Sequence, residues 1–290
     1  MKTRFVLLIT CSLMFQACAQ TGGNSQATAG SIGDDHTEKP IINTEGNTLE
    51  ARINTPDGFE RVPVAEKSFG QYLRQLPLKP DGTMVRFYNG LPKPNFNVYT
   101  AVVDLEIGER DLHQCADAVM RLRAEHLWNQ KEYDKIHFNF TNGFRVDYSE
   151  WMKGKRIAVK GNDVSWYQAG SPSNTYKDFW KYMEIIFSYA GTLSLAKELK
   201  PVKTDQLQIG DVFVQGGSPG HAVIVVDVAT RPETGEKIFL LAQSYMPAQQ
   251  IQILKNRNED ISPWYSADFG EVLETPEWTF TNKDLKRFGE

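Results

Sequence analysis

Apolar residues recur along most of the chain with the periods of helices and strands, and this patterning begins near residue 48. Runs rich in β-branched and aromatic residues at 84–90 and 96–107 predict strands. The segment 111–127 lacks Gly and Pro and carries apolar side chains at steps of three and four. It therefore predicts a helix, with Asp111 as its N-cap.

The remaining part of the chain alternates between the same two periods. Residues 137–148 predict a hairpin that turns at Asn142-Gly143, and a short strand near 156–159 follows. A second long helix is expected from Tyr176 to about Glu198. Further strands are expected at 212–215, 221–228, 237–244 and 249–254. This order indicates one α+β domain over residues 48–290, with an antiparallel sheet packed on helices.

The start of the chain has the pattern of an export signal. Lys2 and Arg4 precede an apolar run at 5–15, which is too short for a membrane span of about 20 residues. The run ends in Phe15-Gln16-Ala17-Cys18, which resembles a bacterial lipoprotein box, where the chain is cut before the cysteine and the thiol is acylated. Residues 1–17 are then a lipoprotein signal peptide. The alternative is a simple signal peptide that leaves a soluble secreted protein.

Acylation of Cys18 would anchor the protein in the cell envelope through its lipid, facing the periplasm or the outside. Residues 18–47 are rich in Gly, Ser, Thr, Asn and Gln, so a flexible tether is expected there. The composition is 41% apolar and 23% charged, which is typical of a globular protein. The net charge of −4 gives no basic signal, and no nucleic-acid partner is expected.

Removal of the signal peptide leaves Cys115 as the sole thiol of the expected domain. A single cysteine in an exported enzyme, with a histidine elsewhere, is a candidate nucleophile and base. His221 is the best base, because it opens a strand after a Gly-rich loop that lets a ligand approach closely. Pairing that strand with the next one sets Ser244 opposite His221, and a slip of one residue sets Gln243 there. We favour Gln243, whose amide oxygen can hold the imidazole.

The segments Leu207–Val214 and Gly220–Asp227 resemble the core of NlpC-type and CHAP-type cell-wall cysteine hydrolases. In those enzymes a Gly-Asp turn starts one strand and Gly-His starts the next. The resemblance implies a papain-like core, with an inserted hairpin-helix segment between Cys115 and His221. It also implies that Cys115 is the nucleophile, His221 the base and Gln243 the orienting residue.

The whole chain also resembles a family of bacterial lipoproteins known only as a domain of unknown function. The segments that carry this resemblance are Gln114–Asp117 and Ala242–Tyr245. For the chemistry itself, the backbone N–H of Cys115 and the side chain of Gln114 are expected to form an oxyanion site. No metal or organic cofactor is needed.

These features lead to the hypothesis of a lipid-anchored cysteine hydrolase that cleaves an amide bond. The anchor and the resemblance suggest peptidoglycan stem peptides as substrate. The main alternative is an inactive envelope binding or scaffolding protein, because Cys115 lies on the apolar stripe of its helix and free cysteines are often buried and inert. Amide transfer is a third possibility, and it would need a carboxylate beside His221.

His113 and Asp117 have metal-ligand spacing but lack a third ligand, so a surface pair is expected.

Overall fold

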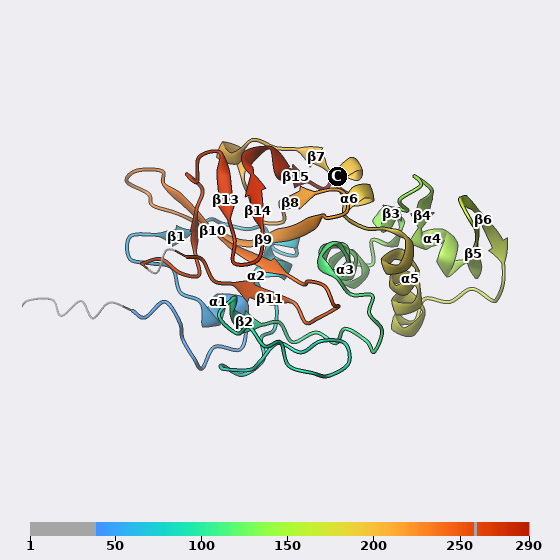
Figure 1. Ribbon diagram of the computed structural model, residues 1–290, viewed down its shortest axis with the longest axis horizontal. Coiled ribbons are helices and arrows are strands. Elements are labelled where there is room, and N and C mark those ends of the chain that lie inside the picture. Colours follow the sequence, from blue (N-terminus) through green and yellow to red (C-terminus); the bar gives the residue numbers. More distant parts are fainter. Residues whose placement is uncertain (1–38, 258–259, 290) are drawn as a thin grey trace, which may run out of the picture. The chain divides into compact units, whose positions relative to one another are not determined.

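The computed structural model describes residues 39–257 and 260–289 (Figure 1). The signal peptide 1–17, the lipidation site Cys18 and the tether up to residue 38 lie outside the described residues. Residues 40–47 were expected to belong to the tether, but they pack on the fold. The backbone N–H of Asn43 donates to the Arg52 carbonyl oxygen, and the Arg52 side chain donates to the Gly46 carbonyl oxygen. The domain therefore begins earlier than the sequence pattern indicated, because Ile41 and Ile42 add apolar contacts to the core.

The described residues form six α-helices, three short 3-10 helices (Tyr133–Lys135, Thr204–Gln206 and Asn282–Asp284) and fifteen strands. The helices are α1 (Leu49–Arg52), α2 (Phe69–Arg74), α3 (Cys115–Asn129), α4 (Tyr148–Met152), α5 (Tyr176–Tyr189) and α6 (Thr192–Glu198). The strands are β1 (Glu60–Arg61), β2 (Tyr99–Val102), β3 (His137–Asn139), β4 (Arg145–Asp147), β5 (Lys155–Lys160), β6 (Asp163–Gln168), β7 (Lys200–Pro201), β8 (Val212–Gln215), β9 (His221–Thr230), β10 (Lys237–Gln243), β11 (Gln252–Leu254), β12 (Tyr265–Ser266), β13 (Val272–Glu274), β14 (Thr279–Thr281) and β15 (Leu285–Arg287). No helix in this described part is both long and apolar enough to cross a membrane.

One antiparallel sheet organises the domain. Its strands run in the order β2-β11-β10-β9-β8-β15-β7, while β1 pairs with β9 and β12 pairs with β10. Every pairing in this sheet is antiparallel. The expected α+β class with an antiparallel sheet is therefore confirmed.

Both faces of the sheet are covered, which explains why β9 is buried over nearly its whole length. Ala222, Ile224 and Val226 point into a core shared with α1, α2 and α3. Val223 and Val225 point into a second core with the β13–β14 hairpin and β15. A strand that is buried on both sides reads as a continuous apolar run, and residues 222–226 have that sequence.

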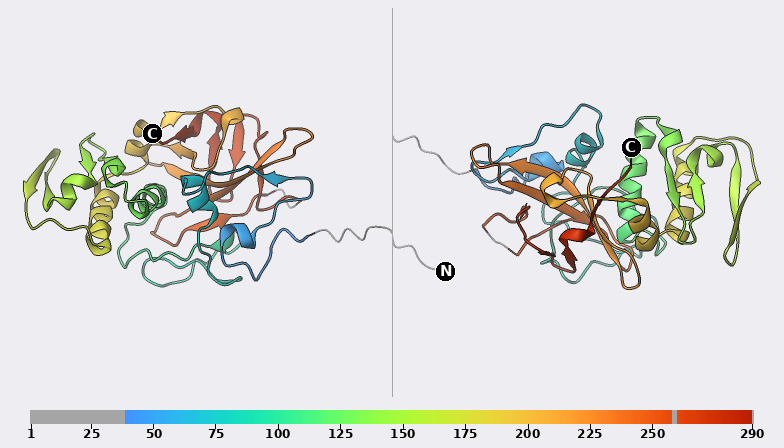
Figure 2. Two further views of the ribbon diagram at one scale, coloured as in Figure 1. Left: turned by 180° about the vertical axis from the view of Figure 1, so that it is seen from behind. Right: turned by 90° about the horizontal axis from the view of Figure 1, so that it is seen from above.

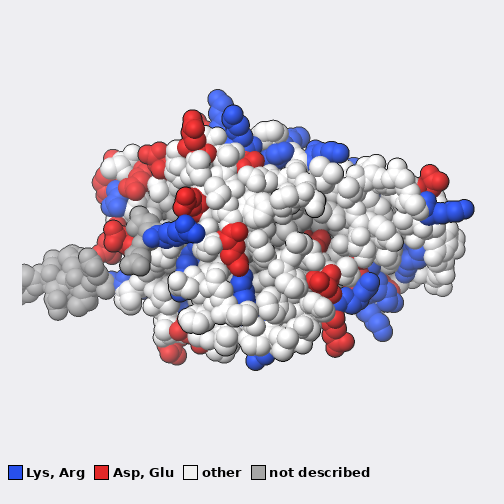
Figure 3. Space-filling model, in the orientation of Figure 1, with Lys and Arg blue, Asp and Glu red and all other residues white. Residues whose placement is uncertain are grey.

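The segment between α3 and β8 forms a separate layer. It contains the β3–β4 hairpin, α4, the β5–β6 hairpin, α5 and α6, and most of it lies on the side of α3 that faces away from the sheet (Figures 1 and 2). Trp151, Tyr148 and Tyr182 are buried between α4 and α5. On the face drawn in Figure 3, acidic and basic side chains are interspersed over the molecule.

Both long helices differ from the sequence expectations. The helix expected at 111–127 begins at Cys115, because Asp111 accepts hydrogen bonds from Ala248 N–H and the Gln114 side chain and stays in the preceding turn. The helix expected at 176–198 breaks at residues 190–191 into α5 and α6.

Of the two strands expected at 84–90 and 96–107, only β2 forms. Residues 84–90 contribute isolated bridges at Arg86 and Phe87.

Candidate functional site: a buried thiol, imidazole and amide

Cys115 is the first residue of α3, directly after the N-cap Gln114. Backbone N–H groups in the first turn of a helix have no partner within the helix and carry partial positive charge. The N–H groups of Cys115, Ala116 and Ala222 all lie where they favour a thiolate at Cys115. Gln114 N–H donates to the Asp117 carboxylate at 3.0 Å, which fixes the start of the helix. The thiol thus sits one turn closer to the helix N-terminus than the sequence indicated.

His221 is the first residue of β9 and pairs with Gln215 of β8. Its Nε2 lies 2.8 Å from Oε1 of Gln243, the last residue of β10. The imidazole is 1% exposed and is surrounded by the rings of Tyr245, Trp278 and Phe280 at centroid distances of 4.8, 5.3 and 5.9 Å. These rings exclude water from the bond between His221 and Gln243.

The sheet register brings Gln243 to His221 by a different route from the one expected. The β9–β10 pairing shifts between Leu240 and Leu241, and it ends with Ala242 opposite Ile224. Gln243 itself pairs with Gln252 of β11, so its side chain reaches His221 diagonally along the sheet. The strand-pairing estimate that set Ser244 or Gln243 directly opposite His221 was wrong.

Ser244, the alternative partner of His221, is engaged elsewhere. Its hydroxyl lies 2.8 Å from the carbonyl oxygen of His113 and 2.7 Å from that of Gln249. Ser244 therefore ties the strand end to the turn that precedes α3 and does not contact the imidazole through a hydrogen bond in the described structure.

A second layer of polar groups supports Gln243, and sequence reasoning missed it. Gln243 Nε2 donates to Oε2 of Glu277 at 2.6 Å, and Lys93 Nζ donates to the same oxygen at 2.6 Å. Glu277 lies in the turn between β13 and β14, and Lys93 lies in the loop before β2. Neither segment has a motif, so no local signal marks these residues.

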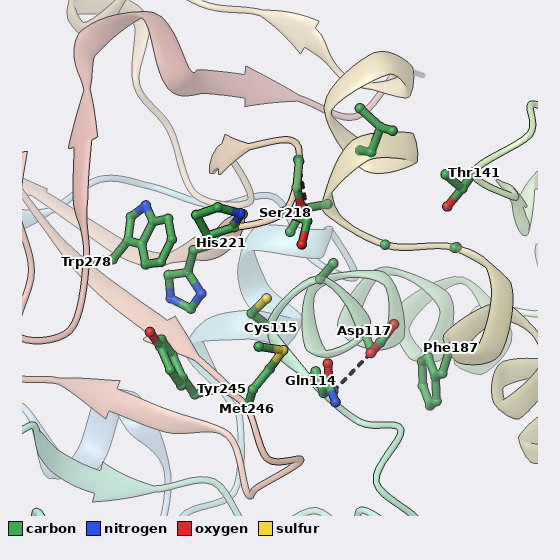
Figure 4. Close-up of a pocket in the computed structure, with 18 residues that line it drawn as sticks. Gln114, Cys115, Asp117, Thr141, Phe187, Ser218, His221, Tyr245, Met246 and Trp278 are labelled. Atoms are coloured by element: carbon green, nitrogen blue, oxygen red, sulfur yellow. Dashed lines mark hydrogen bonds between the residues drawn. The ribbon is translucent and has the colours of Figure 1, made fainter.

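Cys115 and His221 line one pocket of about 570 Å³. Figure 4 shows Cys115 and His221 in the lining of this pocket, with Trp278 and Tyr245 on the His221 side. Phe187 and residues 190–193 form part of the opposite wall, so the inserted segment shapes the pocket. No hydrogen bond joins the Cys115 sulfur to the His221 ring among the described residues, and Cys115 is 8% exposed.

Burial keeps both groups uncharged at neutral pH. It raises the pKa of the Cys115 thiol to about 11, and the nearby Asp117 carboxylate adds to this shift. It lowers the pKa of His221 to about 4; the hydrogen bond to Gln243 raises it and the charge of Lys93 lowers it further. At pH 7 the site therefore holds a thiol and a neutral imidazole. That imidazole is in the protonation state of a base.

The remaining candidate residues are placed as follows. Gln114 lines the pocket, and its Nε2 donates to Asp111 at 3.1 Å. His113 and Asp117 are both buried, so the expected surface pair was wrong: His113 is held inside by contact with Phe187 and with the Gln249 carbonyl oxygen. Within residues 39–257 and 260–289, no three His, Cys, Asp or Glu side chains gather closely enough to bind a metal ion.

The fold and the site together define an α+β protein with Cys115 and His221 in a pocket beside a helix N-terminus, and with Gln243 hydrogen-bonded to His221. Residues 49–287 match the model of the family described as "Domain of unknown function (4846)", and the chain belongs to that family. Neither a curated protein nor a solved structure matches the chain.

Proposed function

We propose that this protein is a cysteine hydrolase that cleaves an amide bond, with Cys115 as nucleophile, His221 as base and Gln243 as the residue that orients the imidazole. One observation supports this most strongly. A thiol at a helix N-terminus shares a pocket with a histidine whose far nitrogen is hydrogen-bonded to an amide oxygen. Supplied by α3, β9 and β10, these are the three types of group that nucleophilic thiol chemistry uses.

The steps follow from the protonation states. His221 Nδ1 removes the thiol proton as the sulfur attacks the carbonyl carbon of the substrate, forming the C–S bond. The oxygen of the tetrahedral intermediate accepts hydrogen bonds from the Cys115 N–H and, after rotation away from Asp111, from the Gln114 side chain. The imidazolium then gives its proton to the leaving amine as the C–N bond breaks. Water, deprotonated by His221, hydrolyses the remaining thioester and restores the thiol.

Burial sets a condition on this mechanism. A thiol with a pKa of about 11 is ionised in about one molecule in ten thousand at pH 7. Proton transfer to His221 must therefore accompany substrate binding, which brings the carbonyl to the sulfur and completes the pocket.

As substrate we propose peptide amides of the cell envelope, with stem peptides of peptidoglycan as the first to test. This extends the expectation of a papain-like hydrolase that is anchored through Cys18. The pocket is compatible with an apolar part of a peptide, because its lining includes Phe187, Leu193, Met246 and Trp278.

The test is digestion of purified peptidoglycan by the full chain, with new free amino groups counted by dinitrophenylation and fragments identified by mass spectrometry. We expect wild-type protein to release new amines, and Cys115→Ala and His221→Ala to release none. His137→Ala, in the β3–β4 hairpin, is the matched control and retains activity. Equal release by wild type and Cys115→Ala would contradict the proposal.

A second candidate is an inactive binding protein of the same fold. The high pKa of Cys115 and the absence of a hydrogen bond from its sulfur to His221 favour it. In that case the pocket binds a peptide that stays intact, and Cys115→Ala leaves the dissociation constant for peptidoglycan fragments unchanged while no fragment is cleaved.

A further inference from the structure

A chain of three hydrogen bonds leads away from the imidazole. His221 Nε2 contacts Gln243 Oε1 at 2.8 Å, Gln243 Nε2 contacts Glu277 Oε2 at 2.6 Å, and Lys93 Nζ contacts that same oxygen at 2.6 Å. The four residues come from β9, β10, the β13–β14 turn and the loop before β2. These three hydrogen bonds can therefore form only after all four segments have folded.

The chemistry of the groups fixes the direction of each bond. A carboxylate only accepts hydrogen bonds, so Glu277 requires the NH2 group of Gln243. The amide oxygen of Gln243 must then face His221, and an oxygen can only accept. The imidazole therefore donates from Nε2, which leaves Nδ1 without a proton and with its lone pair available to the thiol.

We propose that Glu277, held in place by Lys93, is a positioning residue that selects the Nε2–H tautomer of His221 by fixing the orientation of the Gln243 amide. An amide has nearly the same shape when its oxygen and nitrogen exchange places. Without the carboxylate, the Gln243 NH2 group can turn toward His221 and donate to Nε2. The ring proton then moves to Nδ1, which faces the sulfur. A protonated Nδ1 has no free lone pair and cannot act as a base.

Burial gives this selection its strength. Gln243 is 1% exposed and Lys93 is 4% exposed, so water does not offer either group an alternative partner. A polar group that loses its hydrogen bond at such a buried site keeps its desolvation penalty without compensation. The positive charge of Lys93 balances the Glu277 carboxylate, and the rings of Tyr245 and Trp278 close the remaining sides of the imidazole.

The catalytic consequence rests on the proposed function, whereas the tautomer can be measured in the resting protein. A long-range 1H–15N correlation spectrum of full-length protein labelled in histidine distinguishes the two ring nitrogens, and His221→Gln assigns the signal. We expect the wild type to show a protonated Nε2 and an unprotonated Nδ1. A wild-type signal with the proton on Nδ1 would overturn the inference.

The decisive variant is Glu277→Gln, which keeps the size of the side chain but can both donate and accept. We expect it to populate both His221 tautomers, while the exposed Glu274→Gln on β13 leaves the wild-type spectrum unchanged. A purely Nε2-protonated ring in folded Glu277→Gln would refute the role of Glu277.

Where hydrolysis is detected, Glu277→Gln should lower kcat by about tenfold to a hundredfold with little change in KM. A tautomer change without any hydrolysis in wild type would keep this inference and reject the proposed function.

Discussion

At the scale of single residues, burial is the strongest influence on the chemistry of the site. It is the largest cause of the shifts at both Cys115 and His221, and it moves each pKa away from neutrality. The hydrogen bond that His221 makes to Gln243 Oε1 acts on the His221 pKa in the opposite direction but is the smaller effect. The site is therefore at rest in its neutral form, and any catalysis depends on what a substrate does to the pocket.

The ring of Trp278 supplies part of this burial and can be tested by itself. Trp278→Ala should admit water to His221 and raise its pKa from about 4 toward the ordinary value of 6.5, because loss of desolvation favours the imidazolium. An NMR titration of His221 measures this pKa. Trp166→Ala, on β6 in the inserted segment, is the control. A pKa that stays near 4 in Trp278→Ala would show that Trp278 is not responsible for the shift.

Single residues also show the limits of prediction from sequence. Cys115 and His221 could be proposed because each is distinctive in its own segment: one is a lone thiol and the other follows a Gly-rich loop. Gln243 was favoured on a strand pairing that proved wrong, and the contact forms because the side chain reaches diagonally. Glu277 and Lys93 could not be proposed, since their role depends on contacts across 34 and 184 residues of chain.

At the scale of elements, two close approaches build the pocket: α3 against β9, and the 216–220 loop against α6. Gly220 lies where the loop passes the first residue of α6, and a β-carbon on it would come within 2.5 Å of Thr192 Oγ1 and 2.6 Å of the Gly217 carbonyl oxygen. The sequence showed that this loop is rich in Gly. It gave no indication that the residue crowding Gly220 is Thr192, which follows the helix break at residues 190–191.

We expect Gly220→Ala to lower the free energy of unfolding by roughly 2 kcal/mol, because two of the three atoms nearest to the new methyl group are backbone oxygens. Urea denaturation followed by circular dichroism measures the change. Gly170→Ala is the matched control, because a β-carbon there meets nothing within 4 Å, and it should change stability by less than about 0.5 kcal/mol. Equal stability of the two variants would show that the loop adjusts freely.

At the scale of the whole molecule, the sequence pattern indicated the α+β class, whereas it could not give the strand order. The order β2-β11-β10-β9-β8-β15-β7 joins strands from both ends of the domain. The last strands, β13 to β15, cover and extend the sheet, and their short runs resemble loops in sequence. Apolar periodicity reports which residues are buried, and it does not report which strands are neighbours.

The buried histidines predict a stability that depends on pH. His113 and His221 have pKa values lowered by burial to about 3 and about 4, against 6.5 in the unfolded chain. Between these values the unfolded state binds more protons, so stability is complete above pH 6.5 and falls as the pH drops toward 4. The raised pKa of buried Asp117 acts in the opposite sense, since it lowers stability as pH rises from 3.8.

Comparison of wild type with His113→Gln isolates one histidine. The wild-type free energy of unfolding should fall between pH 7 and pH 4.5 by about 2–3 kcal/mol more than that of the variant, because the variant lacks one of the titrating groups. Urea denaturation at the two pH values measures it. The same fall in both proteins would mean that His113 is protonated in the folded state at pH 4.5.

The most direct test of the central claim is the rate at which iodoacetamide alkylates Cys115, measured by mass spectrometry of its peptide as a function of pH in wild type and His221→Gln. If His221 removes the thiol proton as the sulfur attacks iodoacetamide and displaces iodide, wild type should react at least about tenfold faster near pH 7. The two rates should converge as the pH approaches the thiol pKa of about 11, where the imidazole is no longer needed. The same rate in both proteins at every pH would contradict the pairing of Cys115 with His221.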